Sequence, residues 1–124
     1  ENIIVGVDSK DGNVAVRGWM KGTSTSVLEL TRNMADIGVK RIMYTDVSRD
    51  GTLTAPNYRV VKELVDRSGL RILAAGGIGT TRQLIKLAHI GVEATIVGKA
   101  LYTGNVNLVT ALRDVSNIST KGSK

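Results

Sequence analysis

The sequence has no cysteine, no phenylalanine and only one proline among its 124 residues. Without cysteine, the chain forms neither a disulfide framework nor a thiolate metal site, and we expect a cytoplasmic protein. No apolar run approaches the roughly 18 to 20 residues that span a bilayer, and the first residues do not resemble a signal peptide. These absences exclude disulfide-stapled secreted proteins and membrane-spanning proteins.

Aromatic residues are also scarce, at 3% of the sequence, so the core must be assembled from Val, Ile, Leu and Ala. Such a core suits strands that helices bury on both faces. The length and the 42% hydrophobic content are typical of one compact domain. We expect that domain to occupy residues 1–115, with residues 116–124 as a flexible tail. Because the chain starts at Glu1, directly ahead of an expected strand, we also expect it to be cut or processed from something longer.

The formal net charge is +6, and a basic field of this kind attracts phosphates of any origin, including nucleic acid. However, the Lys and Arg residues are scattered through expected helices and the tail, without interleaved aromatic residues. This distribution favours solvated helix faces over a nucleic-acid surface. Nucleic-acid binding therefore remains only the weaker alternative.

Four short apolar runs rich in β-branched residues predict strands at residues 3–7, 41–45, 71–75 and 94–97. The segments between and after them have helical spacing, at residues 26–37, 58–67, 81–90 and 106–115. The expected order is therefore a strand followed by a helix, repeated four times. Short links between helix and strand in such a repeat make a right-handed parallel sheet, so we predict an α/β fold.

Residues at the helix ends support this assignment. Asn57, Thr80 and Asn105 are expected N-caps, while Gly38 and Gly91 follow the first and third helices as stops. Two architectures accommodate four such units, a small doubly wound sheet and half of a (β/α)8 TIM barrel. The turn after the first strand reads GVDSKDGNV, with an acid where a dinucleotide-binding fold needs glycines. The sequence therefore favours a parallel (βα)4 half-barrel.

A half-barrel exposes two sheet edges and the surface that would form the barrel interior. We expect that inner face to be apolar and to consist of Val5, Val7, Met43, Leu73, Ala75 and Ile96. Exposed sheet edges recruit partners, so we expect completion by self-association into a homodimer or a higher homo-oligomer.

Glycines follow the third and fourth expected strands, in the turns AAGGIG and VGKAL. Gly76, Gly77 and Gly98 stand where a strand gives way to a helix, and free backbone N–H groups at such a point favour a phosphate. A glycine pair alone is about as often an ordinary tight turn. Two such turns on successive strands favour phosphate binding.

The first two turns contain the titratable groups. Asp8 ends the first strand and Asp50 lies just past the second, so both are expected at one mouth, where two carboxylates can act as general acid and base. The alternatives are a cap or turn role for Asp8 and an ordinary Asp-Gly turn for Asp50. Thr45, at a strand end, is more often a sheet residue. Arg17 and Trp19 lie in a long first loop, where an aromatic side chain has no core to fill.

The strings GVDSKDGNVAVRGW, YTDVSRDGTLTAPN, LAAGGIGT and VGKALYTG follow one another in order over about residues 3 to 112. Together they closely resemble the C-terminal half of the phosphoribosylformimino-5-aminoimidazole carboxamide ribotide isomerase family of histidine biosynthesis. The VRGW segment favours this family over the cyclase subunit of imidazole glycerol phosphate synthase, which shares the half-barrel ancestry and the DGT and GG motifs. The cyclase remains an alternative.

The resemblance implies an Amadori rearrangement, in which the aminoaldose of a bisphosphorylated ribotide opens and becomes an aminoketose without any cofactor or metal. One acid protonates the ring oxygen, and one base removes the proton next to the imine. By motif, Asp8 matches the carboxylate that ends the fifth barrel strand, Thr45 a supporting threonine and Asp50 the acid or base of the next loop. Related isomerases that also accept phosphoribosylanthranilate fit the same motifs.

For phosphate, the resemblance implies a site formed by Gly51, Gly77, Gly98 and the backbone of Lys99. Arg17 and Trp19 resemble a loop that closes over the substrate. The family's other essential aspartate and its second phosphate site belong to an N-terminal half that this sequence does not contain. We therefore expect weak or no activity from a single copy, with full activity if a second copy or another chain supplies that half. The alternative is a self-assembling half-barrel scaffold without turnover.

Overall fold

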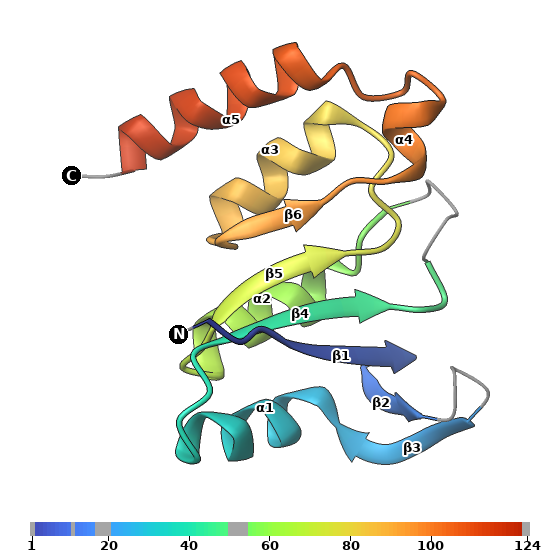
Figure 1. Cartoon of the computed structure of the whole chain (residues 1–124), viewed down its shortest axis with the longest axis vertical. Coiled ribbons are helices and arrows are strands. Elements are labelled where there is room, and N and C mark those ends of the chain that lie inside the picture. Colours follow the sequence, from blue (N-terminus) through green and yellow to red (C-terminus); the bar gives the residue numbers. More distant parts are fainter. Residues whose placement is uncertain (1, 11, 17–20, 50–54, 123–124) are drawn as a thin grey trace.

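The computed structural model describes residues 2–10, 12–16, 21–49 and 55–122. Strands and helices follow one another in the order β1 (Val5–Lys10), β2 (Asn13–Val16), β3 (Lys21–Ser26), α1 (Val27–Asp36), β4 (Arg41–Asp46), α2 (Tyr58–Arg67), β5 (Arg71–Ala75), α3 (Thr81–Ile90), β6 (Ala94–Ile96), α4 (Lys99–Tyr102) and α5 (Leu108–Gly122). The strands form one sheet in the order β3-β2-β1-β4-β5-β6 (Figure 1).

The centre of this sheet is the predicted parallel array. Strand β4 pairs in parallel with β1 and with β5, and β5 pairs in parallel with β6. A helix follows each of these strands before the next one begins, as right-handed crossovers require. The prediction of an α/β fold with four successive strand-helix units is confirmed.

The antiparallel hairpin β2–β3 is an addition that the sequence did not predict, because its residues were assigned to a long loop. Strand β1 continues to Lys10, and its last two residues pair with β2, Ser9 with Val14 and Lys10 with Asn13. Strand β3 is rich in Thr and Ser, and β2 is only 4 residues long, so neither strand carries a clear apolar alternation. Pairing with the end of β1 satisfies backbone groups that a loop would leave to water.

The predicted N-caps of α2 and α3 and the predicted stop at Gly91 are confirmed. The Asn57 side chain accepts a hydrogen bond from the Val60 N–H, and Thr80 forms a capping box with Gln83. Gly91 ends α3 with φ of +109°, a conformation that favours glycine.

The prediction fails at the last helix. Helix α5 begins at Leu108, and Asn107 rather than Asn105 accepts the N–H of Thr110, at 3.1 Å. The short helix α4 occupies the intervening turn, which the apolar periodicity did not indicate. Helix α5 runs to Gly122, past the expected domain end at residue 115. The division of the chain into a domain and a tail stays a prediction.

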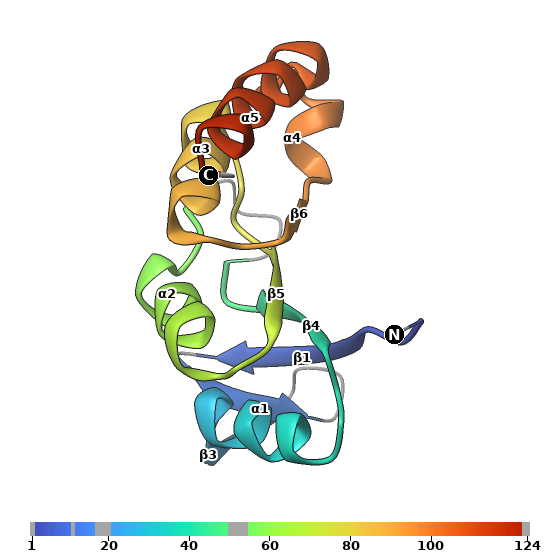
Figure 2. The same ribbon diagram turned by 90° about the vertical axis from the view of Figure 1, so that its left-hand side faces the viewer.

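Helices α1, α2 and α3 lie on one face of the sheet and leave the other face uncovered (Figure 2). The core fills the space between these helices and the strands. Its largest fully buried apolar side chains come from α1, α2 and α3 and from β4 and β5: Val27, Ile42, Tyr44, Val61, Leu64, Ile72 and Leu87.

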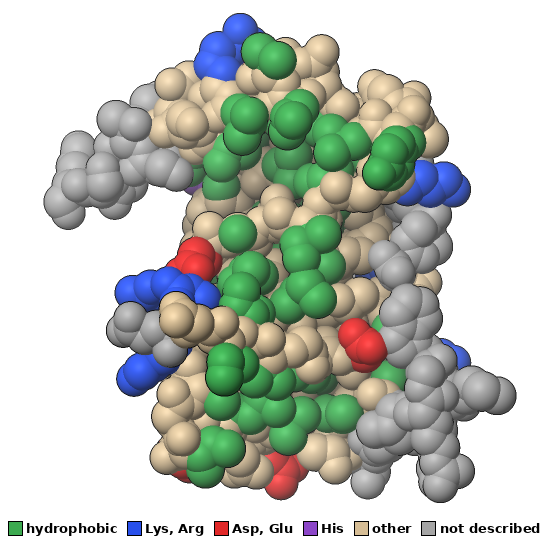
Figure 3. Space-filling model, in the orientation of Figure 1, with side chains coloured by type: hydrophobic (Ala, Val, Ile, Leu, Met, Phe, Trp, Pro, Cys, Tyr) green, Lys and Arg blue, Asp and Glu red, His purple; other side chains and the backbone are tan. Residues whose placement is uncertain are grey.

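The uncovered face carries many apolar side chains (Figure 3). Strand register decides which residues contribute to it. Val5 pairs with Ile42 and Val7 with Tyr44, so both valines share the helix-covered face, and Val7 is only 3% exposed. The prediction that Val5 and Val7 line the inner face was wrong. An offset of one residue in a strand exchanges its two faces, so Gly6 and Asp8 lie there instead.

Candidate functional site

Asp8 and Thr45 are directly opposite each other in the β1–β4 register, on the face that the helices leave uncovered. Adjacent strands are about 4.8 Å apart, so the carboxylate and the hydroxyl come from neighbouring positions. Thr45 is 7% exposed and Asp8 is half-buried. The row continues through Ala75 and Ile96 in the next two strands. The structure thus brings two predicted site residues together near the carboxyl ends of the strands.

Four other predicted site residues, Arg17, Trp19, Asp50 and Gly51, lie outside the described residues. Their roles therefore stay predictions.

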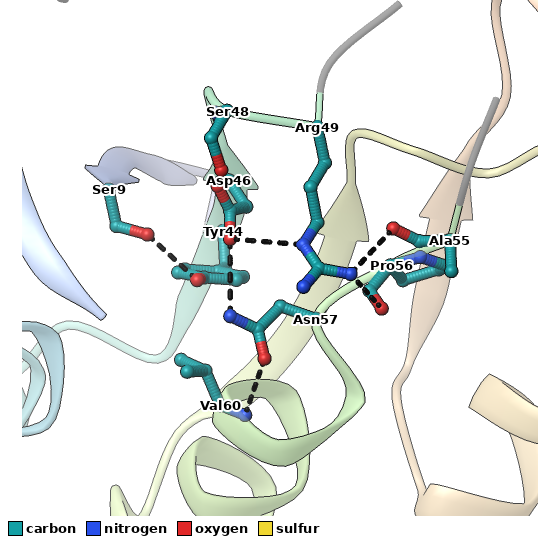
Figure 4. Close-up of polar contacts among 9 residues, drawn as sticks. All are labelled: Ser9, Tyr44, Asp46, Ser48, Arg49, Ala55, Pro56, Asn57 and Val60. Atoms are coloured by element: carbon teal, nitrogen blue, oxygen red, sulfur yellow. Dashed lines mark hydrogen bonds and ion pairs between the residues drawn. The ribbon is translucent and has the colours of Figure 1, made fainter. Parts of the chain in front are cut away.

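Asp46, which ends β4, is a site residue that the sequence analysis missed. Its side chain is only 2% exposed and accepts hydrogen bonds from the Ser48 N–H at 3.0 Å, the Ser48 hydroxyl at 2.5 Å and the Asn57 amide at 3.2 Å. A buried carboxylate needs such donors, because burial without them costs several kcal/mol. Asn57 also caps α2, so Asp46 joins the end of β4 to the start of that helix (Figure 4).

Arg49 connects the two ends of the segment that follows β4. Its Nε lies 3.7 Å from Asp46 Oδ2, and its Nη1 donates to the carbonyl oxygens of Ala55 at 3.1 Å and Pro56 at 3.2 Å. Figure 4 shows the guanidinium group lying between the carboxylate and these two carbonyls. The planar guanidinium fork suits several acceptors at once. Arg49 and Ala55 are thereby held next to each other and next to the end of β4.

The glycine turn after β5 is packed against Arg49 and Ala55. Gly76 has φ of +91° and Gly77 has φ of +79°, values that other residues rarely adopt. A Cβ at Gly77 would lie 2.4 Å from the Ala55 carbonyl oxygen and 3.1 Å from Arg49 Cβ. Backbone geometry and close packing therefore require glycine at position 77. The predicted phosphate role of the turn stays a prediction.

Gly98 differs from Gly77. Its φ is −114°, outside the left-handed region, and among the described residues no heavy atom lies within 4 Å of a Cβ built there. Gly98 follows Ile96 by two residues, and Ile96 pairs with Ala75, which directly precedes Gly76. The two glycine turns are thus adjacent at the carboxyl ends of β5 and β6, and α4 begins at Lys99 immediately afterwards.

Tyr44 lies on the opposite side of the sheet from the Asp8 row. The Ser9 hydroxyl donates to its phenol oxygen at 2.7 Å, and the tyrosine is 1% exposed. Burial raises the Tyr44 pKa to about 12, although the hydrogen bond from Ser9 opposes this effect. Tyr44 therefore remains neutral at physiological pH and fixes β1 against β4 from behind the site.

Within the described ranges, no three His, Asp or Glu side chains are grouped as they would be to hold a metal ion. Over the same part of the chain, no helix combines the length and apolarity of a membrane span.

Residues 1–107 match the family described as histidine biosynthesis protein. The chain belongs to the histidine biosynthesis protein family. The barrel fold of this family explains the uncovered face, because four strand-helix units form part of a (β/α)8 barrel whose inner face they expose here.

Several curated relatives of the chain are imidazole-4-carboxamide isomerases, and their full names contain two phosphoribosyl groups. The chain is 43% identical to that of Dehalococcoides mccartyi over 116 residues, covering 94% of this chain and 49% of the relative. It is 45% identical to that of a Thermoanaerobacter species over 112 residues, covering 90% and 47% respectively. For Chloroflexus aurantiacus the identity is 44%, covering 90% and 46%. The chain spans about half the length of the curated relatives it matches.

Proposed function

We propose that this chain supplies one half of the active site of an isomerase in histidine biosynthesis. The reaction is the Amadori rearrangement of a bisphosphorylated aminoaldose ribotide to an aminoketose, by a cytoplasmic enzyme. The observation that carries the proposal is the placement of Asp8 beside Thr45, at the same edge of the sheet as the two adjacent glycine turns that follow β5 and β6. The similarity to imidazole-4-carboxamide isomerases supports the choice of reaction.

In this proposal Asp8 exchanges a proton with the substrate, and Thr45 orients the carboxylate or the substrate from the neighbouring strand. An aldose-to-ketose shift needs one group to protonate the ring oxygen and another to remove the proton next to the imine, so a single carboxylate is insufficient. Asp50 is our candidate for the second group, with Arg17 and Trp19 contacting the substrate. Gly76, Gly77, Gly98 and the Lys99 backbone, together with Gly51, receive one phosphate. The residues require no cofactor or metal for this chemistry.

A second half must complete the site, and we propose that another copy of this chain can supply it. In the described part of the chain, β1 pairs with β2 only at Ser9 and Lys10, and β6 pairs only with β5, so both edges of the parallel array offer backbone groups. Beside β6, an apolar groove of about 1270 Å³ lies between α3, β6 and α5. Ile96, at 46% exposed, and Leu112, at 61%, are apolar side chains that a partner would cover.

Reconstitution tests the proposed reaction. We would mix the chain with the part of the Dehalococcoides mccartyi isomerase that it does not cover, and follow conversion of the bisphosphorylated ribotide. The control pairs that same part with the matching half of the relative itself, which establishes that divided halves can work. Turnover in both mixtures supports the proposal, whereas turnover in the control alone contradicts it.

The uncovered apolar face also supports a second candidate, a half-barrel scaffold that assembles without turnover. Sedimentation of the chain with and without a bisphosphorylated substrate analogue separates the two. An even-numbered assembly that the analogue tightens favours the composite active site. An assembly that ignores the analogue favours the scaffold, and a monomer at micromolar concentration contradicts self-association.

A further inference from the structure

We infer that Arg49 is a positioning residue for the anion-binding end of the site, a role that rests on the proposed phosphate contact of the Gly76–Gly77 turn. The basis is the bridge that its guanidinium makes from Asp46 to the Ala55 and Pro56 carbonyls. Through that bridge Arg49 and Ala55 are held against the turn after β5.

The Asp46 end of the bridge is rigid. The carboxylate is buried at the end of a central strand and accepts hydrogen bonds from Ser48 and Asn57, and Asn57 in turn caps α2. Backbone bonds fix the same place, because the Val47 N–H donates to the Ser9 carbonyl at 2.8 Å and the Arg49 N–H to the Asp46 carbonyl at 3.0 Å. A side chain anchored here holds whatever its other end touches in a defined position.

The other end of the bridge bears on the glycine turn. Ala55, whose carbonyl accepts from Arg49 Nη1, places that oxygen 2.4 Å from where a Cβ of Gly77 would be. The Arg49 Cβ itself lies 3.1 Å from the same point. The backbone at Gly77 is therefore packed against both partners of the hydrogen bond. If Arg49 released Ala55, the contact that supports one side of the turn would be lost.

The geometry of the guanidinium, not its charge alone, is what this role requires. Arg49 reaches one carboxylate and two carbonyls through Nε and Nη1, which are fixed in one plane. A lysine ammonium keeps the positive charge but is a point donor on a flexible stem, so it cannot hold both ends in the same relation. Charge and geometry can therefore be separated by mutation.

The test measures binding of inorganic phosphate by NMR titration, through the amide shifts of Gly76 and Gly77. The variants are Arg49→Gln, which removes the charge and the bridge, and Arg49→Lys, which keeps the charge. Arg82→Gln is the matched control, because Arg82 is an exposed residue of α3 and its loss changes the net charge equally. Urea unfolding of each variant reports the free energy of unfolding separately.

We expect both Arg49 variants to weaken phosphate binding by on the order of tenfold, with Arg82→Gln close to wild type. A purely structural role would lower the free energy of unfolding while leaving the phosphate affinity of the folded chain unchanged, which overturns the inference. Wild-type affinity in Arg49→Lys alone also overturns it, because charge would then suffice. If phosphate shifts neither amide in the wild-type chain, the proposed phosphate site fails as well as the inference. If the wild-type chain binds phosphate and both Arg49 variants bind it equally tightly, only the inference about Arg49 fails.

Discussion

The charged side chains at the two ends of the parallel sheet differ in their exposure to solvent. At the amino end, Arg41 and Arg71 begin neighbouring strands and share Glu93, at 2.6 Å and 3.5 Å, with side chains that are 24% to 64% exposed. At the carboxyl end, the Asp46 side chain is 2% exposed and is surrounded by donors. Exposed ion pairs contribute about 0 to 1 kcal/mol, whereas a buried carboxylate must be fully hydrogen-bonded to be tolerated.

Conformational restriction is concentrated at the carboxyl end of the sheet. The amino end contains ordinary strand starts joined by solvated ion pairs. The carboxyl end contains two successive glycines with positive φ, packed against a loop that a buried carboxylate anchors. In parallel α/β folds the ligand site lies at the carboxyl ends of the strands. Mutations at the carboxyl end should therefore affect catalysis and binding. Mutations at the amino end should change the free energy of unfolding only slightly.

The largest effect is expected at Asp8. In the reconstituted enzyme, Asp8→Asn should lower kcat/KM by about 10²- to 10⁴-fold, the usual contribution of a general acid or base. Asp36→Asn, on the exposed end of α1, is the control and should leave turnover unchanged. Steady-state kinetics on both variants, with mass measurements to confirm assembly, decide the matter. Full activity in Asp8→Asn would show that the carboxyl end does not use this carboxylate.

The next effect concerns Gly77. Its replacement by Ala strains a residue at φ of +79° and forces a methyl group against the Ala55 carbonyl. Gly69→Ala is a close control, because Gly69 has φ of +78° and no described heavy atom lies within 4 Å of its Cβ position. We expect Gly69→Ala to cost about 1 kcal/mol and Gly77→Ala about 2 kcal/mol more, together with loss of phosphate binding. Equal losses in urea unfolding would refute the close contact.

A smaller, pH-dependent effect is expected from Tyr44. Its pKa is about 12 in the folded chain and 10.0 for an ordinary tyrosine, so the unfolded chain loses this proton first. Stability from this group is complete below pH 10 and declines as the pH rises to 12, by about 2 to 3 kcal/mol in total. Tyr44→Phe should lack this decline. Urea unfolding at pH 9 and 11.5 measures it, with Tyr102→Phe, an exposed tyrosine, as the control. Parallel pH curves for wild type and Tyr44→Phe would contradict the assignment.

The smallest effect is expected at the amino end. Glu93→Gln leaves Arg41 and Arg71 without the carboxylate they share, and the loss should be below about 1 kcal/mol because all three side chains contact solvent. Urea unfolding at low and high salt should show a difference that salt reduces. A loss of several kcal/mol that salt does not change would mean that the two ends are less different than their exposure indicates.

Much of the fold was predictable because its signals are local. The apolar runs at residues 41–45 and 71–75 became β4 and β5, and the caps Asn57 and Thr80 satisfy backbone groups only a few residues away. The faces of β1 were not predictable, because Val5 and Val7 are assigned by their register with Ile42 and Tyr44, far away in sequence. The hairpin was missed for a similar reason, since its strands depend on the end of β1.

The candidate site divides in the same manner. Asp8 and Thr45 could be found from their places at strand ends, and register then puts them side by side. Asp46 gave no signal, because an acidic residue at a strand end is usually solvated, and only the fold shows that Asn57 and Arg49 surround it. Gly77 was noticed for phosphate, but the packing of Ala55 against it is visible only in three dimensions.

The Arg49 bridge has a consequence for protein engineering. Exchange of an active-site loop between relatives usually fails when the joining residues move, since the transplanted segment then points elsewhere. Here the Arg49 side chain donates a hydrogen bond to the Ala55 carbonyl, and it also forms an ion pair with the buried Asp46 carboxylate. They are natural splice points, between which a segment that keeps Asp50 and Gly51 can be exchanged while the flanking sheet keeps its shape.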